Sequence, residues 1–400
     1  MIRISARPFH EAFRLLRHNG AGSAAGRPGY PVAPARRQAR RRLSRGLGGR
    51  DRFVMRDLRT ARAGAFLLTA FLLVSTGCGQ REPAAEVVVY SSVDDVYARP
   101  IAERFEKETG IAVRFVPDTE ETKSTGLVNR LIAEKERPQA DVFWSGDPVR
   151  AALLKSKGVT APYRSPSAEG LPGQYSDPEG HWTGFSARAR VLIYNKDLVA
   201  AGREPTSIMD LVDERFRGQA CLANPLFGTT SMHAAALFQV LGDERAKEFF
   251  EKFIANGGTI VSSNGEVRRR VAAGDFAIGV TDTDDAHAAL EEGKPIGVVF
   301  PDAGGMGTLL VPNAVMLIRG APHSEAGKEF IDYLLRPETE LALAESVAAQ
   351  IPLRPGVKAP EGGYSLEQIT PMKVDYVLLA QKLEELSRGF LKEWVDANLR

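Results

Sequence analysis

The chain has 400 residues and a formal net charge of +2 at pH 7, but its charge is divided unevenly along the sequence. Residues 1–77 hold sixteen Arg, no Lys and three acids, a net charge of +13. The remaining residues hold 36 basic and 47 acidic side chains, a net charge of −11. This acidic main part argues against a nucleic-acid partner, and its two cysteines, Cys78 and Cys221, exclude a cysteine-rich metal site.

Residues 55–77 have the pattern of a secretory signal. Arginines precede an apolar run at 65–74, small residues follow it, and the run is too short to span a bilayer. The ending resembles a bacterial lipobox, which implies that Cys78 is lipidated and anchors an exported protein at the periplasmic face of a membrane. We therefore expect a signal peptide at 55–77 and a lipidated tether at 78–85.

The segment before this signal and the second cysteine have simpler interpretations. Residues 1–54 are interpreted as a non-native or disordered basic extension, produced by a start codon placed too far upstream. The basic stretch at 34–52 lacks interleaved aromatic residues, which argues against nucleic-acid binding. Cys221 is expected to be a small buried residue beside a strand.

Strand and helix patterns alternate after the tether. In chain order, the first set consists of strands at 87–90, 111–116 and 141–144, with helices ending at Gly110 and before Pro138. A second set follows the Pro- and Gly-rich stretch 162–184, with strands at 191–194, 276–280, 298–300 and 314–318, helices at 232–241, 244–255, 267–273, 285–292, 325–335 and 339–347, and one long helix at about 373–395. Such alternation predicts an α/β fold with a largely parallel sheet.

The run Thr281–His287 places three carboxylates, Asp282, Asp284 and Asp285, directly after a buried apolar strand. Crowded carboxylates raise one another's pKa unless cations or hydrogen-bond donors share the site. Open α/β folds also place ligands at strand ends. The run is therefore a candidate binding site, and the alternative is an acidic N-cap for the helix that follows.

Five segments carry a family resemblance through their order and spacing. They are Val89–Ser92, Ala140–Ser145, Arg188–Tyr194, Gly274–Gly279 and Pro352–Arg354. In these segments the chain resembles the ferric-iron-binding subfamily of bacterial ABC-importer solute-binding proteins over about residues 86–395. The resemblance implies a two-lobed, type 2-like periplasmic binding protein in which each lobe is a mostly parallel sheet flanked by helices, and a hinge joins the lobes.

The resemblance also implies lobe boundaries. The expected domains are lobe 1 at 86–186 plus 311–355, lobe 2 at 187–310, and C-terminal helices at 356–400. The implied partners are a small ligand and the permease and ATPase subunits in the inner membrane. The protein is expected to be a monomer that is bound to the membrane only through its lipid.

The metal ligands of the subfamily are replaced in this chain. The position where the subfamily usually has a His ligand corresponds to Asp94, and the position of its carboxylate ligand lies near Gly146 or Asp147. The positions of its two adjacent tyrosine ligands correspond to Asp284 and Asp285. Because both phenolates are missing, we expect no intense visible colour with Fe³⁺. The candidate metal ligands are Asp94, Asp147, Asp282, Asp284 and Asp285.

Many members of the subfamily hold a small anion beside the metal, at positions that correspond to Gly228, Thr229, Thr230, Asn264 and Asp282. Free backbone N–H groups at a helix start can hold such an anion, although an ordinary Ser/Thr cap explains the same residues. Arg188 and Arg190 can hold an oxyanion or pair with the acidic run, or be a surface pair. The full set of candidate ligand-binding residues is Tyr90, Ser91, Ser92, Asp94, Trp144, Asp147, Arg188, Arg190, Gly228, Thr229, Thr230 and Asn264.

Carboxylates with water are ligands for hard cations, so the expected ligand is ferric iron or a divalent hard cation such as Mg²⁺, Ca²⁺ or Mn²⁺, with no organic cofactor. An organic cation or zwitterion, of the thiamine, polyamine or aminophosphonate type, is the alternative, with Trp144 or Phe227 stacking on the ligand.

No nucleotide-binding, esterase or zinc-protease motif is present in the sequence, so we expect that the protein is not an enzyme. The alternative from another functional class is a carboxylate-dependent exported hydrolase.

Overall fold

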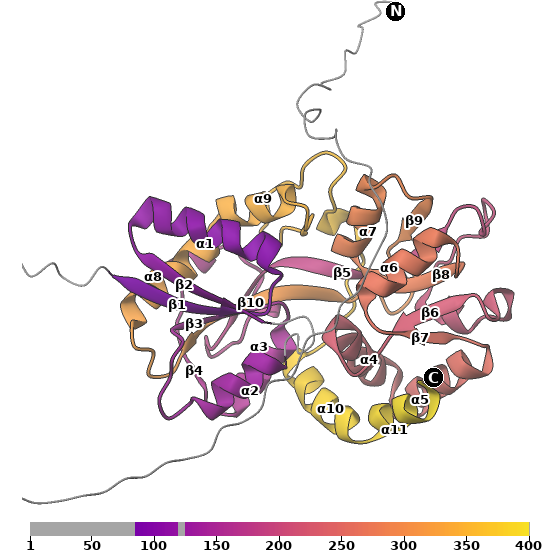
Figure 1. Cartoon of the computed structure of the whole chain (residues 1–400), viewed down its shortest axis with the longest axis horizontal. Coiled ribbons are helices and arrows are strands. Elements are labelled where there is room, and N and C mark those ends of the chain that lie inside the picture. Colours follow the sequence, from indigo (N-terminus) through magenta and orange to yellow (C-terminus); the bar gives the residue numbers. More distant parts are fainter. Residues whose placement is uncertain (1–84, 119–124, 400) are drawn as a thin grey trace, which may run out of the picture. The chain divides into compact units, whose positions relative to one another are not determined.

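The computed structural model describes residues 85–118 and 125–399, which belong to one compact unit, Gly79–Arg400. The predicted basic extension, the signal peptide and the lipidation site Cys78 lie outside the described residues. Across the parts that are described, none of the helices combines the length and hydrophobicity needed to cross a bilayer. The described residues form an α/β structure, in which one sheet of ten strands is flanked by helices (Figure 1).

The first lobe is built on three parallel strands. β1 (Glu86–Ser91) lies between β2 (Ala112–Pro117) and β3 (Val142–Ser145) and pairs in parallel with both. The apolar run Val87–Tyr90 is buried on both faces of the sheet, as expected for a strand covered by helices on both sides. The covering helices are α1 (Asp95–Thr109), α8 (Ser324–Leu334) and α9 (Pro337–Glu345) on one side and α2 (Gly126–Ala133) and α3 (Pro148–Ser156) on the other (Figure 1).

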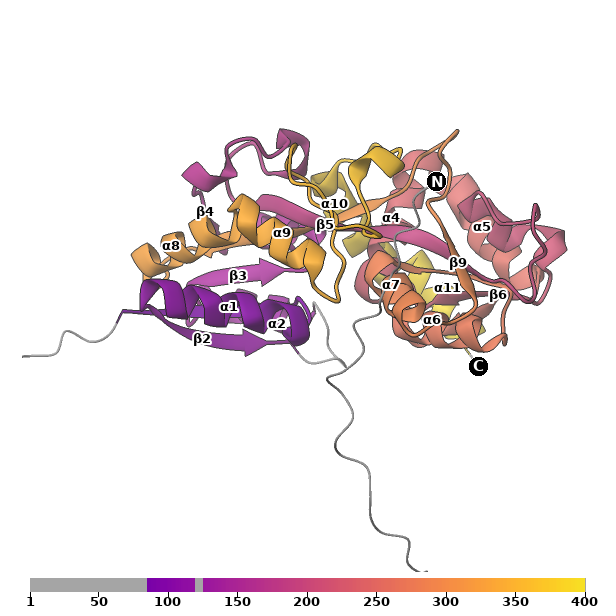
Figure 2. The ribbon, with the colours of Figure 1, turned by 90° about the horizontal axis from the view of Figure 1, so that it is seen from above.

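The second lobe repeats this arrangement. β6 (Ala220–Ala223) lies between β7 (Thr259–Val261) and β8 (Ile278–Asp282) and pairs in parallel with both. Its helices are α4 (Gly228–Leu241) and α5 (Asp243–Ala255) on one side and α6 (Asn264–Ala273) and α7 (Thr283–Glu291) on the other (Figures 1 and 2). β6 and β7 were not expected from the sequence, because runs of three or four residues are too short for a periodic pattern. Cys221 is fully buried in β6, as expected.

Two long antiparallel strands connect the lobes. β5 (Thr183–Asn195) pairs with β10 (Leu310–Ile318) through its first half and with β8 through its second half. β10 also pairs with β3, so one sheet runs through both lobes in the order β2-β1-β3-β10-β5-β8-β6-β7. The short strands β4 (Thr160–Ala161) and β9 (Ile296–Val299) pair with β10 and β5 respectively. The sheet is therefore parallel within each lobe and antiparallel at the connection, and the lobe boundaries given above stay predictions.

The backbone is irregular where β5 and β10 connect the lobes. Ser186 in β5 has a φ of 36°, which is uncommon for a residue other than glycine. The register between the strands shifts between Pro312 and Asn313 of β10. Such irregularities bend a strand and aim side chains, and here they lie beside the candidate site described below.

The C-terminal segment corrects one expectation. The single long helix expected at 373–395 is two helices, α10 (Tyr376–Arg388) and α11 (Phe390–Asn398), separated at Gly389. Glycine has a low helix propensity, and the break lets α11 turn so that Trp394 packs on Phe250 of α5, with ring centroids 5.1 Å apart. α10 packs against both α3 and α4 and so contacts both lobes.

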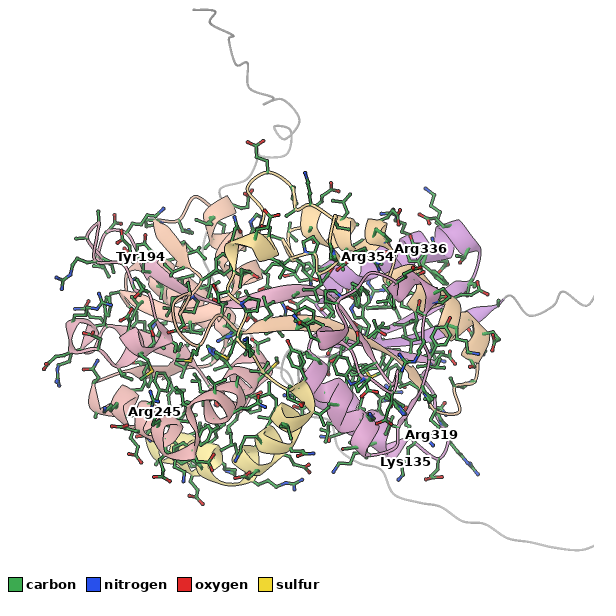
Figure 3. The ribbon with its side chains drawn as sticks, turned by 180° about the vertical axis from the view of Figure 1, so that it is seen from behind. Lys135, Tyr194, Arg245, Arg319, Arg336 and Arg354 are labelled. Atoms are coloured by element: carbon green, nitrogen blue, oxygen red, sulfur yellow. The ribbon has the colours of Figure 1, made fainter. Side chains whose placement is uncertain are left out.

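The other residues that the structure describes form loops and short 3-10 turns. These turns are Pro166–Ala168, Gly173–Tyr175, Ile208–Val212, Glu214–Phe216 and Leu366–Gln368. Figure 3 shows the side chains from behind, with Tyr194 and Arg245 on the second lobe and Lys135, Arg319 and Arg336 on the first.

Candidate functional site

A small pocket lies where the strand ends of the two lobes meet the connecting strands. Its empty volume is about 240 Å³, including the space at its mouth. The residues that line it are Ser92, Val93, Asp94, Tyr97, Gly146, Arg188, Asp284, Asn313 and Gln350. They come from the loop after β1, the start of α1, the loop after β3, β5, α7, β10 and the loop after α9. This is the position at which open α/β sheets place their ligands.

Arg188 joins the two lobes at this pocket. Its Nη2 donates a hydrogen bond to the Gly146 carbonyl oxygen at 2.5 Å, and its Nη1 lies 3.5 Å from Asp282 Oδ2 and 3.9 Å from Asp284 Oδ2. Burial lowers the pKa of this guanidinium, but the carboxylates of Asp282 and Asp284 outweigh burial and raise it. Arg188 is therefore a permanent positive charge in the pocket wall.

Asp282 is held as a carboxylate by Arg190. Arg190 Nη1 lies 2.8 Å from Asp282 Oδ1, and Thr229 donates its hydroxyl to Asp282 Oδ2 at 2.6 Å. Burial alone would raise the pKa of Asp282, but Arg190 and then Arg188 lower it below its usual value. Asn264 Nδ2 also reaches Asp282 Oδ2, at 3.3 Å, so both carboxylate oxygens already have donors. The interpretation of Arg188 and Arg190 as a surface pair is wrong, because Arg190 is fully buried and the side chain of Arg188 is only 16% exposed.

The other anion-site candidates belong to the same network. Arg190 donates to the hydroxyls of Thr229 and Thr230 at 3.0 and 3.2 Å and to Asn264 Oδ1 at 3.2 Å. Gly228, the first residue of α4, has a φ of 54° that suits glycine. The structure thus brings Thr229, Thr230 and Asn264 together in the network around the carboxylate of Asp282, and Gly228 begins the helix that carries the two threonines.

Asp284 differs from Asp282 in its surroundings. It lines the pocket, and Arg188 is the basic side chain paired with it in the described part of the chain, at 3.9 Å. Burial raises the pKa of Asp284 to about 7; Arg188 opposes this shift, and Asp285, Asp282 and Asp94 add to it. Asp284 is the member of the acidic run that faces the pocket and titrates near neutral pH.

Asp285 points elsewhere although it is close by. Oxygens of Asp282, Asp284 and Asp285 lie within 4.8 Å of one another, but Asp285 Oδ2 accepts from the Thr281 hydroxyl at 2.8 Å and does not line the pocket. Burial, and then the charge of Asp282, raise the pKa of Asp285. The run thus lines the pocket through Asp284 and also forms the first turn of α7.

Asp94 and Asp147 precede helices on the first lobe. Asp94 is the N-cap residue of α1 and lines the pocket. Asp147 caps α3, since its Oδ1 accepts from the Arg150 backbone N–H at 2.9 Å, and it lies outside the pocket lining. Its charge nonetheless helps to raise the pKa of Arg188.

Two tyrosines near Asp284 were not expected from the sequence. Tyr97 lines the pocket, and burial followed by the charges of Asp284 and Asp94 raises the pKa of its hydroxyl. Tyr364 lies in the loop before α10, and burial followed by the charge of Asp284 raises its pKa to about 12. Tyr97 lies three positions after Asp94, on the same face of a helix, and this spacing is the signal that would have found it.

Tyr90, Ser91 and Trp144 lie outside the pocket lining, while Ser92 lies in it. Tyr90 donates its hydroxyl to Glu134 at 3.2 Å, and the Ser91 hydroxyl accepts from the Val93 N–H. Trp144 is fully buried beside Phe185, so its ring has no face open to an organic cation. Phe227 is 54% exposed and lies outside the pocket lining.

Comparison with known proteins agrees with this fold. Iron uptake protein A1 of Synechocystis sp. is 26% identical over 319 residues, covering 73% of this chain and 87% of that protein. A periplasmic protein of Salmonella typhimurium named as 2-aminoethylphosphonate-binding is 27% identical over 312 residues, covering 74% and 87%. The crystal structure of iron-bound HitA from Pseudomonas aeruginosa has a TM-score of 0.69 at 22% identity and covers 76% of this chain and 98% of its own.

The family assignment rests on a match that spans most of the folded part. The model of the bacterial extracellular solute-binding protein family matches residues 100–370. The two-lobed periplasmic binding protein fold, expected from the sequence, is confirmed by the structural neighbours. The chain belongs to the bacterial extracellular solute-binding proteins, as the periplasmic solute-binding component of an ABC importer.

Proposed function

We propose that the protein captures a hard metal cation, with ferric iron first among them, in the pocket between its lobes. The observation that carries this proposal is the pocket lining, in which the carboxylates of Asp94 and Asp284 and the phenol of Tyr97 come together. Oxygen ligands of this kind suit hard cations. The pocket is also smaller than the ~300–1,000 Å³ typical of sites for organic molecules. The iron-uptake relative supports the same class of ligand.

The ligand set is narrower than the sequence suggested. Asp94 and Asp284, with Tyr97, are proposed as protein ligands. Asp282 is proposed to act through Arg190 as a fixed charge, because its oxygens already accept hydrogen bonds from Arg190, Thr229 and Asn264. Asp147 and Asp285 are proposed as supporting charges, because both lie outside the lining.

Thermal shift measurements on chelator-treated protein test this proposal. Fe³⁺ supplied as the nitrilotriacetate complex should stabilise the wild type, since a ligand at 100 times its dissociation constant adds about 2.7 kcal/mol. Asp284→Asn should abolish the shift, while the matched variant Asp285→Asn should keep most of it. Equal shifts in wild type and Asp284→Asn would rule out the pocket as the metal site.

Visible spectroscopy tests the role of Tyr97. A ligating phenol must lose its proton, and a bound metal ion supplies the charge that offsets its raised pKa. The sequence alone predicts no intense colour, but with Tyr97 in the pocket we expect a phenolate-to-iron band with Fe³⁺. The band should disappear in Tyr97→Phe. It should persist in Tyr90→Phe, because the Tyr90 hydroxyl donates to Glu134 and lies outside the pocket lining. A band that survives Tyr97→Phe would remove Tyr97 from the ligand set.

A zwitterionic ligand of the aminophosphonate type is the second candidate. Arg188 in the pocket wall favours it, because a guanidinium beside Asp94 and Asp284 offers charges of both signs to one small molecule. The 2-aminoethylphosphonate-binding relative supports this reading. If it holds, 2-aminoethylphosphonate should stabilise the wild type and fail to stabilise Arg188→Gln, and Fe³⁺ should have no effect on either.

The cellular setting follows from the family, and its details are proposals. The protein is proposed to deliver its ligand to permease and ATPase subunits, as a monomer held at the membrane through Cys78. Mass spectrometry of the protein from membranes tests the anchor: a diacylglyceryl group on Cys78 as the first residue supports it, and a mature chain that begins upstream of Cys78 contradicts it.

A further inference from the structure

The strand β10 carries a polar atom that the site described above does not use. Asn313 is 1% exposed and lines the pocket from the strand that connects the lobes. Within residues 85–118 and 125–399, its Oδ1 is buried and accepts no hydrogen bond. A buried amide oxygen without a donor costs free energy, so such atoms are rare in folded proteins.

The orientation of this amide is fixed by its surroundings. Asn313 Nδ2 donates to the Gln350 side-chain oxygen at 2.6 Å and to the Ser186 carbonyl oxygen at 3.1 Å. Both partners are oxygens that accept, so a flipped amide would place oxygen against oxygen. Oδ1 must therefore point away from Gln350 and Ser186, as an acceptor held in place by two bonds.

The backbone is irregular next to Asn313. The register between β5 and β10 shifts immediately before Asn313, which pairs with Phe185, and Ser186, the β5 residue skipped at the shift, has a φ of 36°. Irregular pairing of this kind re-aims side chains and persists only where the surrounding structure holds it. Gln350, which orients the amide, lines the pocket as well.

We infer that Asn313 Oδ1 binds the positively charged part of the ligand, as a metal ligand or as the acceptor for an ammonium N–H. This inference rests on the proposed function of the pocket and adds to it a neutral carbonyl oxygen from the strand that connects the lobes. Amide carbonyl oxygens bind hard cations, and they accept hydrogen bonds from ammonium groups. Gln350 acts as a positioning residue, because it accepts from Nδ2 and so fixes the direction in which Oδ1 points.

Three variants separate binding by Oδ1 from support by Nδ2. Asn313→Leu has a similar size and removes both atoms. Asn313→Asp keeps an oxygen at the Oδ1 position and loses the donor. Ser186→Ala is the matched control, because the Ser186 hydroxyl is equally buried and unpartnered in the described residues but lies outside the lining. Unliganded melting temperatures are measured first, and Asn313→Ser replaces Asn313→Leu if the latter does not fold.

Affinity is measured by fluorescence titration with ferric nitrilotriacetate, Mn²⁺ and 2-aminoethylphosphonate. For the probe that binds the wild type, we expect Asn313→Leu to lose about tenfold or more in affinity, Asn313→Asp to keep or exceed the wild-type affinity, and Ser186→Ala to be unchanged. Equal losses in Asn313→Leu and Asn313→Asp overturn the inference, since Nδ2 would then be the atom that matters. Unchanged affinity in Asn313→Leu overturns it as well.

Asp284→Asn, titrated in parallel, distinguishes a failure of the role inferred for Asn313 from a failure of the proposed function of the pocket. If Asp284→Asn weakens binding and Asn313→Leu does not, the inference fails and the proposed function stands. If Asp284→Asn binds like the wild type, the pocket is not the binding site and both fail. Both also fail if no probe binds the wild type.

Discussion

At the scale of single residues, two aspartates two positions apart have opposite electrostatic settings. Asp282 is paired with a fully buried arginine and hydrogen-bonded by Thr229, so its pKa is lowered. Asp284 faces the pocket, and burial raises its pKa to about 7. The sequence predicted that this run belongs to a site, but it could not show that Asp282 and Asp284 have different pKa shifts. That difference depends on Arg190 and Arg188, which are distant in the chain.

Removing Arg190 should destabilise the fold strongly. Arg190→Met leaves the carboxylate of Asp282 buried without its closest cation, and breaking a buried pair from one side costs about 3–5 kcal/mol. Urea unfolding should show this loss in the free energy of unfolding. Arg217→Met, which breaks an exposed pair with Glu214, should cost about 0–1 kcal/mol. Similar small losses for both variants would mean that the buried network around Asp282 contributes little to the free energy of unfolding.

Asp284 should make stability depend on pH in a defined direction. Its folded pKa of about 7 exceeds its usual value of 3.8, so between these values the native state binds more protons than the unfolded state. Stability should therefore fall as pH rises from about 4 to about 7. Asp284→Asn should flatten this dependence, when urea unfolding is compared at pH 5 and pH 8. A wild type that gains stability relative to the variant over this interval contradicts the raised pKa.

Among the helices and strands, the C-terminal helices show that an amphipathic pattern alone does not predict where a helix ends. The amphipathic pattern over 373–395 predicted one helix, and the apolar positions of both α10 and α11 do fit it. Gly389 interrupts the pattern, but whether a glycine ends a helix depends on the packing available beyond it. Here that packing is a cluster of rings, in which Trp394 packs on Phe250 and Phe253, and Phe390 packs on Phe250.

Truncating Trp394 should therefore loosen the second lobe. Its ring packs on Phe250 and its Nε1 donates to the Phe250 carbonyl oxygen at 3.2 Å. Trp394→Ala should lower the free energy of unfolding by about 3–5 kcal/mol. Leu399→Ala, at a position that is 52% exposed in the same segment, serves as the control and should change it little. An equal effect of the two variants would mean that α11 is not docked through Trp394.

At the scale of the whole molecule, the fold was more predictable than the site. Alternating strand and helix patterns and five short segments sufficed for a two-lobed α/β protein, because these patterns are local. The pocket takes Ser92, Asp94 and Tyr97 from the first part of the chain and Asn313 and Gln350 from far beyond it. Asn313 and Gln350 have no local signal, since their role arises only where β5 and β10 connect the lobes.

Anomalous diffraction from crystals grown with Mn²⁺ or ferric nitrilotriacetate shows directly whether the pocket binds a metal ion. We expect one strong anomalous peak in the pocket, at coordination distance from carboxylate oxygens of Asp94 and Asp284, and the loss of that peak in Asp284→Asn. A peak located only elsewhere on the protein, or a pocket filled by an organic molecule with no anomalous signal, would contradict it.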